Sequence, residues 1–173
     1  ASRTDSVESH LGRYVAPGGD AFTALNTGLL KGGLFMRIPE NAVIKEPIHI
    51  VYFTEATKGG SVSQVRNLIL AGKMSKVSIV ETYVAGEGQD YFTNAVTEIV
   101  LEEGSRLEHC KIQKESPAAF HVATTQVVQR RGSSFVSFAL STGGRLSRND
   151  CRIALAEEGA SCELNGLYLG DND

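Results

Sequence analysis

The chain of 173 residues is long enough for one domain with a sizeable apolar core. Its 17 basic and 20 acidic residues nearly balance, and no basic stripe with interleaved aromatic residues appears, which argues against nucleic acid as the main partner. No apolar run is long enough to span a membrane and no signal peptide opens the chain, so the sequence predicts a cytoplasmic protein without a membrane partner.

Two short amphipathic helices are predicted at the start of the chain. Residues 5–15 place Val7 and Leu11 on one face, and residues 20–30 begin at Asp20, a favourable N-cap residue. A Pro-Gly-Gly run separates the helices, and a Gly-Gly pair ends the second one. We interpret residues 1–33 as a helical lead-in to a domain formed by residues 34–173.

The first strands are predicted at residues 34–38 and 43–53, on either side of a Pro-Glu-Asn corner. Asn41 in this corner tolerates the left-handed backbone conformation, so it can stand where glycine stands in later corners. A Lys-Gly-Gly run at residues 58–60 is the next predicted corner.

One pattern then recurs: a short apolar run, a polar pair, a glycine, a small residue and another apolar run. It is clearest at residues 97–107, 125–135 and 152–162, with a looser copy at residues 67–75. The corner glycines are Gly72, Gly104, Gly132 and Gly159, which are 32, 28 and 27 residues apart. Repeats of this length indicate a stacked architecture, in which neighbouring copies bury a core that no single copy can close.

Aliphatic residues recur at fixed distances from these glycines. Four residues before them stand Leu68, Val100, Val128 and Leu155, and eight residues after them stand Val80, Ile112, Leu140 and Leu167. Three residues after them the residues are mixed: Ser75, Leu107, Phe135 and Cys162. We expect the aliphatic columns to point inward. Because the inward columns then sit at both even and odd offsets from the glycine, which a strand of strict period two would not allow, we infer a bend or bulge after the corner.

The predicted fold is therefore mainly β, a right-handed parallel β-helix (solenoid) with a short N-terminal helical cap. The cap is expected to cover one end of the solenoid, which would otherwise expose core and unpaired strand edges. An antiparallel sandwich is the alternative, but it would explain only the short strands and not the columns in register.

The chain stops at a corner, at residues 171–173, where nothing resembles a cap. This predicts that the chain is the core fragment of a longer protein. It also predicts that the exposed edge strand near residues 166–173 pairs with another copy, giving a homo-oligomer.

No catalytic constellation is apparent, so we predict that the chain is not an enzyme. It lacks a Gly-x-Ser-x-Gly elbow, a His-Glu-x-x-His motif and a phosphate-binding loop. Its six aspartates are scattered, and the pairs Glu102-Glu103 and Glu157-Glu158 fit solvated corners. The alternative is a β-helix carbohydrate-active enzyme, a lyase or hydrolase, which would need clustered carboxylates.

Three cysteines, Cys110, Cys151 and Cys162, are weak candidates for metal ligands. They fall at different offsets in the repeats, whereas a metal site needs three or four convergent ligands, so we favour reduced structural thiols. His109 and Cys110 alternate along a strand and should face opposite sides. His10, His49 and His121 have no partner visible in the sequence.

The amino-acid sequences of three segments resemble those of a known family. Residues 20–39 read Asp-Ala-Phe-Thr-Ala-Leu-Asn-Thr-Gly-Leu-Leu-Lys-Gly-Gly-Leu-Phe-Met-Arg-Ile-Pro, residues 47–50 read Pro-Ile-His-Ile, and residues 166–169 read Gly-Leu-Tyr-Leu. Together they resemble the SufB/SufD family of the SufBCD iron–sulfur cluster assembly complex. The Ala-Leu-Asn-Thr-Gly and Gly-Leu-Tyr motifs are more similar to the SufD branch of that family.

This resemblance implies a right-handed parallel β-helix core in a non-catalytic scaffold subunit of the SUF system. It implies association with a SufB-like subunit and a SufC-like ATPase. It also implies that this segment holds no cofactor and that the whole complex handles the iron–sulfur cluster transiently. The family's N-terminal helical region and C-terminal region have no counterpart here, so no functional residue is carried over.

Overall fold

The computed structural model describes residues 3–15, 20–55, 60–86 and 90–170. Its helices are α1 (Arg3–His10) and α2 (Ala21–Gly28). Its strands are β1 (Gly32–Ile38), β2 (Ile48–Thr54), β3 (Ser61–Ala71), β4 (Lys76–Ala85), β5 (Tyr91–Leu101), β6 (Arg106–Lys114), β7 (Phe120–Gln129), β8 (Ser134–Thr142), β9 (Leu146–Leu155) and β10 (Ser161–Leu169). No helix among these described residues is long and apolar enough to cross a membrane.

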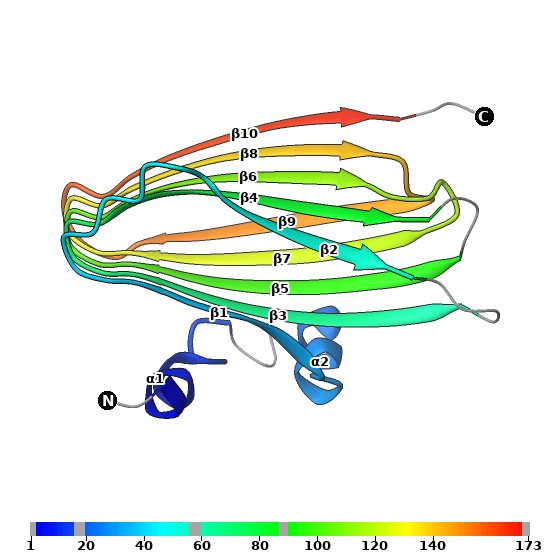
Figure 1. Cartoon of the computed structure of the whole chain (residues 1–173), viewed down its shortest axis with the longest axis horizontal. Coiled ribbons are helices and arrows are strands. Elements are labelled where there is room, and N and C mark those ends of the chain that lie inside the picture. The colour runs from blue at the N-terminus through cyan, green and yellow to red at the C-terminus, as the bar shows by residue number, and fades with distance from the viewer. Residues whose placement is uncertain (1–2, 16–19, 56–59, 87–89, 171–173) are drawn as a thin grey trace.

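The strands form two five-stranded sheets (Figure 1). Sheet A has the order β1-β3-β5-β7-β9 and sheet B the order β10-β8-β6-β4-β2, so successive strands alternate between the sheets. Every pairing between these strands is parallel. This arrangement confirms the parallel β-helix and excludes the antiparallel sandwich.

The first strands differ in length from the prediction. The predicted strand at residues 43–53 begins only at Ile48, while Val43 makes an isolated bridge to Lys76. Pro47 explains the delay, because proline has no N–H to donate to a strand ladder. Of the predicted corner at residues 58–60, only Gly60 lies within the described residues, and it has a positive φ of 84°. Residues 171–173 also lie outside the described residues.

Each coil turns between its two sheets at a residue with left-handed backbone. The residues at this corner are Asn41, Met74, Gly104, Gly132 and Gly159, with φ between 55° and 74°. The N–H of each of the first four donates to a carbonyl in the next coil, at 2.8–3.0 Å. The prediction for Asn41 is confirmed.

Gly72 was wrongly placed in that corner, where Met74 stands instead. The role of Gly72 is to leave space, because a Cβ there would lie 2.8 Å from the backbone oxygen of Ile38 and the backbone nitrogen of Glu40. The looser copy of the repeat thus has its glycine two residues early. A methionine with a φ of 55° gives no sequence signal for a corner.

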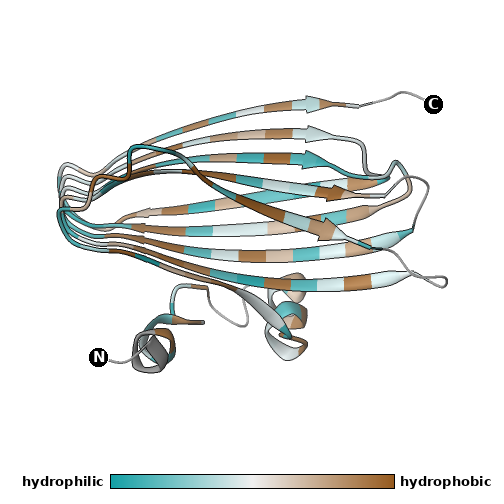
Figure 2. Ribbon diagram, viewed as in Figure 1, coloured by the Kyte–Doolittle hydropathy of each residue, from teal (hydrophilic) through white to brown (hydrophobic). Residues whose placement is uncertain are grey.

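The interior is lined by residues of one parity on each strand, so no bulge after the corner is needed. In sheet A, the row Met36, Ile69, Ile99, Val127 and Ile153 is stacked in register and faces inward. In sheet B, the row Val77, Leu107, Phe135 and Cys162 faces inward. Figure 2 shows the resulting alternation of apolar and polar positions along the strands.

The two predicted inward columns were therefore largely wrong. Leu68, Val100 and Val128 have the opposite parity to Ile69, Ile99 and Val127 and face outward from sheet A. Val80, Ile112, Leu140 and Leu167 likewise face outward from sheet B, whereas Leu155 alone faces inward. Aliphatic residues occupy both faces of these parallel sheets, so being aliphatic does not identify the inner face.

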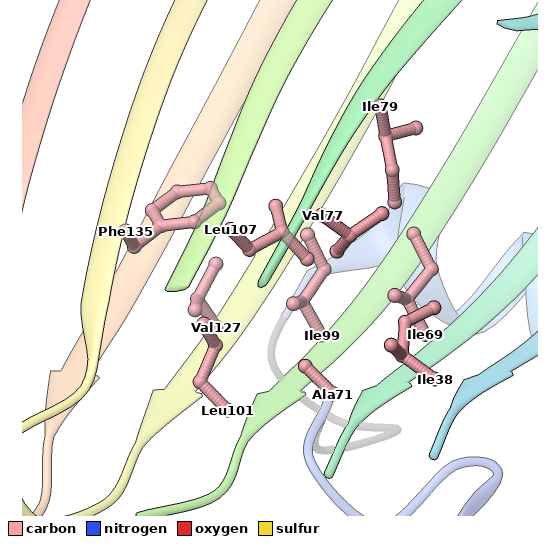
Figure 3. Packing of buried hydrophobic residues seen from close by; sticks show 10 residues of the cluster. All are labelled: Ile38, Ile69, Ala71, Val77, Ile79, Ile99, Leu101, Leu107, Val127 and Phe135. Atoms are coloured by element: carbon pink, nitrogen blue, oxygen red, sulfur yellow. The ribbon is translucent and has the colours of Figure 1, made fainter. Parts of the chain in front are cut away.

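The apolar core fills the half of the interior next to the left-handed corner (Figure 3). Its buried members are Ile38, Ile69, Ala71, Val77, Ile79, Ile99, Leu101, Leu107, Val127 and Phe135. They come from both sheets and from successive coils, as expected when each coil shares its core with its neighbours.

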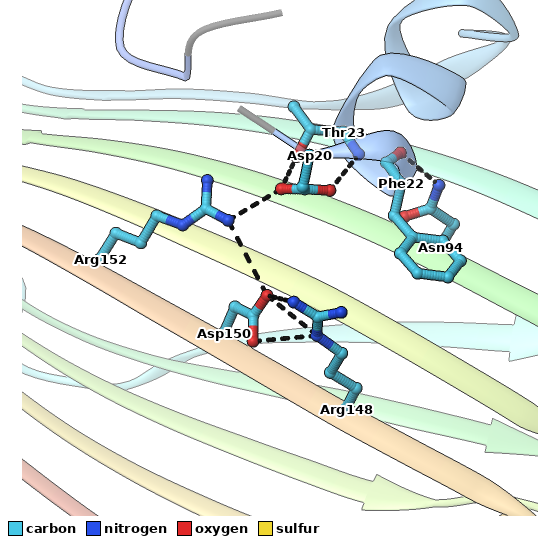
Figure 4. A network of polar contacts seen from close by, with 7 residues as sticks. All are labelled: Asp20, Phe22, Thr23, Asn94, Arg148, Asp150 and Arg152. Atoms are coloured by element: carbon cyan, nitrogen blue, oxygen red, sulfur yellow. Dashed lines mark hydrogen bonds and ion pairs between the residues drawn. The ribbon is translucent and has the colours of Figure 1, made fainter. Parts of the chain in front are cut away.

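Helix α2 crosses the outer face of sheet A. Asp20 caps it as predicted, accepting from the Thr23 N–H at 2.8 Å, and also accepts from Arg152 of β9 at 2.8 Å (Figure 4). At the other end, the Asn26 side chain donates to the Val65 carbonyl of β3 at 2.9 Å and to the Asn94 carbonyl of β5 at 3.0 Å. The helical segment thus covers a face of the solenoid, not the end that we expected.

The segment after α1 is held to the same face by one buried carboxylate. Glu98 of β5 accepts from the backbone N–H groups of Gly12 at 2.9 Å, Tyr14 at 3.0 Å and Val15 at 3.4 Å. It also forms a buried ion pair with Arg66 of β3 at 2.7 Å. A single side chain therefore joins two strands to the N-terminal segment.

We predict that Glu98→Gln destabilises the chain by about 3–5 kcal/mol, because Arg66 would keep a buried charge without a counter-charge. The N-terminal segment should also exchange its amide hydrogens faster. Urea unfolding and hydrogen exchange of residues 3–15 measure these two effects. Glu103→Gln is the control, because the Lys73–Glu103 pair is exposed and should contribute about 0–1 kcal/mol. If Glu98→Gln lowered the free energy of unfolding by less than about 1 kcal/mol, Glu98 would not be the counter-charge that Arg66 requires.

A second prediction concerns the corner. Gly132→Ala should cost about 1 kcal/mol in the free energy of unfolding, because its φ of 62° disfavours a Cβ although the surrounding space is open. Gly28→Ala is the matched control, since it is equally open and lies in a helix, where alanine is neutral or favourable. Equal effects of the two substitutions in urea unfolding would refute the role of the corner.

Candidate functional site: the polar half of the lumen

Away from the left-handed corner the interior of the β-helix becomes polar. Sheet B continues inward with Glu81 and Tyr83 on β4, and with His109, Lys111 and Gln113 on β6, all buried. Sheet A faces them with Asn67, Thr97, Thr125, Thr93 and His121, which are also buried. Strand alternation places these side chains inside, because they have the same parity as the apolar core residues. We name this set of residues the polar lumen.

Glu81 is the centre of the first cluster. Its Oε2 lies 2.9 Å from Nε2 of His109, and its Oε1 accepts from the Tyr83 hydroxyl and, at 3.3 Å, from the Asn67 amide. Burial alone would raise the pKa of Glu81, but the hydrogen bond and charge of His109, the charge of Lys111 and the Tyr83 hydroxyl together lower it. Burial and the neighbouring Glu81 raise the pKa of Tyr83 well above its usual value. Glu81 is therefore an ionised acceptor and Tyr83 a donor.

Lys111 is the centre of the second cluster. Its Nζ lies 3.0 Å from Nε2 of His121 and 3.2 Å from Oδ1 of Asn149. Nδ1 of His121 lies 2.8 Å from Oε2 of Glu115. The three titratable side chains thus form a line, Lys111–His121–Glu115, through the middle of the solenoid.

The electrostatics of this line follow from its burial. Burial lowers the pKa of Lys111 to about 8, against the opposing charges of Glu81 and Glu115. Burial, and then the charge of Lys111, lower the pKa of His121. A neutral His121 fits the contact with Lys111, because its Nε2 can accept from the Lys111 ammonium. Its Nδ1 lies close to the Glu115 carboxylate but not in hydrogen-bond geometry.

Hollows lie at both ends of the line. A cavity of about 290 Å³ is lined by Lys111, His109, Asn149 and Cys151, among others. A larger hollow of about 650 Å³ at the other side is lined by Glu115 and its neighbours. The cavity beside Lys111 and His109 is therefore large enough to hold a small polar species. In the described part of the chain, no three His, Cys, Asp or Glu side chains are placed to hold a metal ion.

The three candidate cysteines do not converge. Cys110 lies on the outer face of β6, whereas Cys151 of β9 and Cys162 of β10 face the lumen at the last described coil. All three are free thiols. Partial burial, and then the nearby Cys162, raise the pKa of Cys151 to about 11, so its thiol is protonated at neutral pH. Only Cys151 lines the cavity.

The histidines were partly anticipated. His109 and Cys110 face opposite sides, as predicted. His10 and His49 contact hydroxyls, of Tyr14 and Thr82 respectively. The charged partners of His109 and His121 were missed, because Glu81 lies one coil away from His109 and Lys111 lies on the opposite sheet from His121. The available signal was parity: His109 and Lys111 follow Leu107 at every second residue and so share its inward side.

The paired glutamates lie at corners, as predicted. Glu103 pairs with Lys73 at 3.3 Å, Glu157 with Arg130 at 3.2 Å and Glu158 with Arg131 at 3.5 Å, all with exposed side chains. Each pair joins neighbouring coils on the outside of the solenoid. None of them faces the cavity beside Lys111.

Comparison with known proteins gives the chain its family. Residues 52–173 match the model described as "SUF system FeS cluster assembly, SufBD core domain", and residues 1–50 match "SufBD protein N-terminal region". The chain belongs to the SufBD family. The resemblance seen in the sequence is thus confirmed at the level of the family. The expectation that the family's N-terminal region has no counterpart here is wrong, because residues 1–50 match it.

Among its relatives is an "Iron-sulfur cluster assembly SufBD family protein" of Synechocystis, 29% identical over 98% of this chain. The chain spans 39% of the length of that SufBD relative. The SufD protein of Bacillus subtilis is 26% identical over 85% of this chain and 30% of its own length, and SufB of the same organism is 24% identical over 90% and 33%. Such similar values do not separate the two branches, so the SufD assignment stays a prediction.

A third prediction concerns Lys111 of the polar lumen. Its pKa of about 8 lies below the ordinary 10.5, so the unfolded chain binds more protons between these two values. Lys111 should therefore raise the free energy of unfolding as pH rises from 8 to 10.5, by about 3 kcal/mol in total. This contribution is complete above pH 10.5 and is lost as pH falls through 8.

Lys111→Met removes this titration, so the stability difference between the variant and the wild type should change by that amount across the interval. Urea unfolding at several pH values measures it, with Lys114→Met, an exposed lysine of the same strand, as the control for losing one positive charge. A difference that stays constant with pH would mean that Lys111 keeps its proton throughout.

Proposed function

We propose that this SufBD-family chain is the β-helical core of a scaffold subunit for iron–sulfur cluster assembly, on the SufD-like side of the family. It acts by association with a SufB-like subunit and a SufC-like ATPase, and it is not itself an enzyme. The observation that carries the proposal is the match of residues 52–173 to the SufBD core domain. The names of the relatives in Synechocystis and Bacillus point the same way.

The end of the solenoid is better suited to association with another protein than to catalysis. β10 pairs with β8 on one side, and no described strand pairs with its other side. At this end, Leu155 and Leu164 are about half exposed although they have inward parity. A free strand edge beside exposed apolar side chains favours strand-to-strand pairing with another β-helix, either a SufB-like subunit or a second copy.

The carbohydrate-enzyme alternative gains no specific support. Such an enzyme needs carboxylates free to act as acid and base. Among the described residues of the lumen, Glu81 and Glu115 are both buried and held by His109 and His121. We therefore assign the iron–sulfur cluster as cargo of the assembled complex, with no resident cofactor in this chain. The three free thiols fit a reducing compartment such as the cytoplasm.

Co-purification tests the proposal. The tagged chain, expressed with the SufB-like and SufC-like proteins of the same organism, should retain the SufB-like subunit. Leu164→Lys at the open end should reduce that retention about tenfold or more, because a charge would be buried at the interface. Leu30→Lys, which is similarly exposed but lies between α2 and β1, should leave it unchanged. Retention of neither subunit by the wild-type chain would refute the scaffold assignment.

A further inference from the structure

The outer face of sheet B carries an apolar band that no described element covers. Its rows run across the strands, in register from β2 to β10. The central row is Val51, Thr82, Ile112, Leu140 and Leu167, and the flanking rows add Val80, Cys110 and Phe138 on one side and Phe53, Val84 and Leu169 on the other. The first flanking row also holds the polar residues His49 and Asn165, and the second holds Lys114 and Thr142. Phe53 is 68% exposed, Leu169 56%, Val51 54% and Phe138 41%. We name these residues the sheet B band.

A bare apolar face is unusual for a parallel sheet, because parallel sheets are normally covered on both sides. The other sheet of this chain obeys the rule. Its outer face is crossed by α2, which reaches from Arg152 of β9 to Val65 of β3. Residues beneath the N-terminal segment, such as Val96 and Glu98, are fully buried. Sheet B has the same architecture, but none of the described elements covers its outer face.

The size of the band decides between possible occupants. Five strands at about 4.8 Å spacing and three rows about 6.7 Å apart make a face of roughly 400 Å², including the side-chain margins. A standard protein–protein interface covers about 800 Å² on each partner, so the band is about half that size and suits a small docking element better than the face of a second copy. A single α-helix is about 10 Å wide, and about 13 residues span the five strands at 1.5 Å per residue.

Charges flank the band unequally. On the side towards the left-handed corner, the next row holds Glu108 and Glu163, both exposed. Ser78 donates to Glu108 at 2.8 Å and Asn165 to Glu163 at 2.8 Å, so the two carboxylates are held in place. An occupant with lysine or arginine along this flank would match them, whereas one with acidic residues would be repelled.

We propose that the sheet B band docks an amphipathic helix of a partner protein, lying across the strands with its basic flank over Glu108 and Glu163. The described helices of this chain cannot supply it, since α2 and the segment after α1 are held against sheet A by Asn26, Asp20 and Glu98. This proposal rests on the geometry of sheet B and does not depend on the assembly role proposed above.

The test uses the 173-residue chain and a designed probe, a fluorescein-labelled helical 15-residue peptide with leucine on one face and lysine along one flank. Fluorescence anisotropy should give saturable binding to the wild-type chain. Phe138→Lys, or Leu167→Lys as a second variant, should weaken it about tenfold or more. Val62→Lys is the control, because Val62 is 64% exposed but lies on sheet A. Thermal unfolding checks that each variant is folded.

Charge variants test the orientation. The double variant Glu108→Lys with Glu163→Lys should weaken binding of the lysine peptide and strengthen binding of the same peptide with glutamate on its flank. Equal affinities of the wild type and Phe138→Lys would overturn the proposal. So would a wild-type dimer, seen by size exclusion, that Phe138→Lys converts to monomer, because the occupant would then be a second copy.

Discussion

Parallel pairing in register between successive coils is the constraint on which the other features of this β-helix depend. Once each strand pairs with its counterpart one coil away, a residue necessarily stacks on the equivalent residue of its neighbours, about 4.8 Å distant. Rows of Ile69, Ile99 and Val127 inside the solenoid are the direct result. The left-handed corner maintains that register, because its N–H groups donate to the next coil and fix where each strand begins.

Register also explains how charge can be buried in so narrow an interior. Glu81 and Lys111 occupy one row of sheet B, with Ile50 and Ala139 on either side of them. Stacking brings opposite charges from neighbouring coils within range of each other, and His109 and His121 complete the pairing from adjacent positions. A buried ion pair gains little net free energy over an apolar one. The polar half of the lumen is therefore not explained by a gain in stability.

Much of the fold could be predicted from the sequence, because the repeat carries its own signal. Glycines recurring every 27 to 32 residues revealed the stack, and the tolerance of asparagine for positive φ revealed the corner at Asn41. The inner face could not be identified in the same way. Leu68 and Val100 are buried although they face outward from sheet A, and Val128 is half-buried, so aliphatic residues lie on both faces of this sheet. Only the structure, which shows the face of sheet A that packs against sheet B, distinguishes the inner face from the outer face.

The candidate site was harder still. His121 lies ten residues from Lys111 in the sequence, and nothing local links them, because their contact crosses from one sheet to the other. The three cysteines were considered as metal ligands because thiolates bind metals, yet of the three only Cys151 lines the cavity. Parity along β6 would have placed His109 and Lys111 inside, but only knowledge of which parity is inward makes that useful.

The two anchors of α2 have a consequence for how this chain can vary. Solenoids ordinarily gain or lose whole coils at little cost, since each coil contacts only its neighbours. Here the α2 segment has a fixed length and is hydrogen-bonded at Asp20 to β9 and at Asn26 to β3 and β5. Inserting or deleting a coil between β3 and β9 would separate or crowd those fastenings by one strand spacing. The length of α2 therefore restricts the number of coils that can lie between its two contacts.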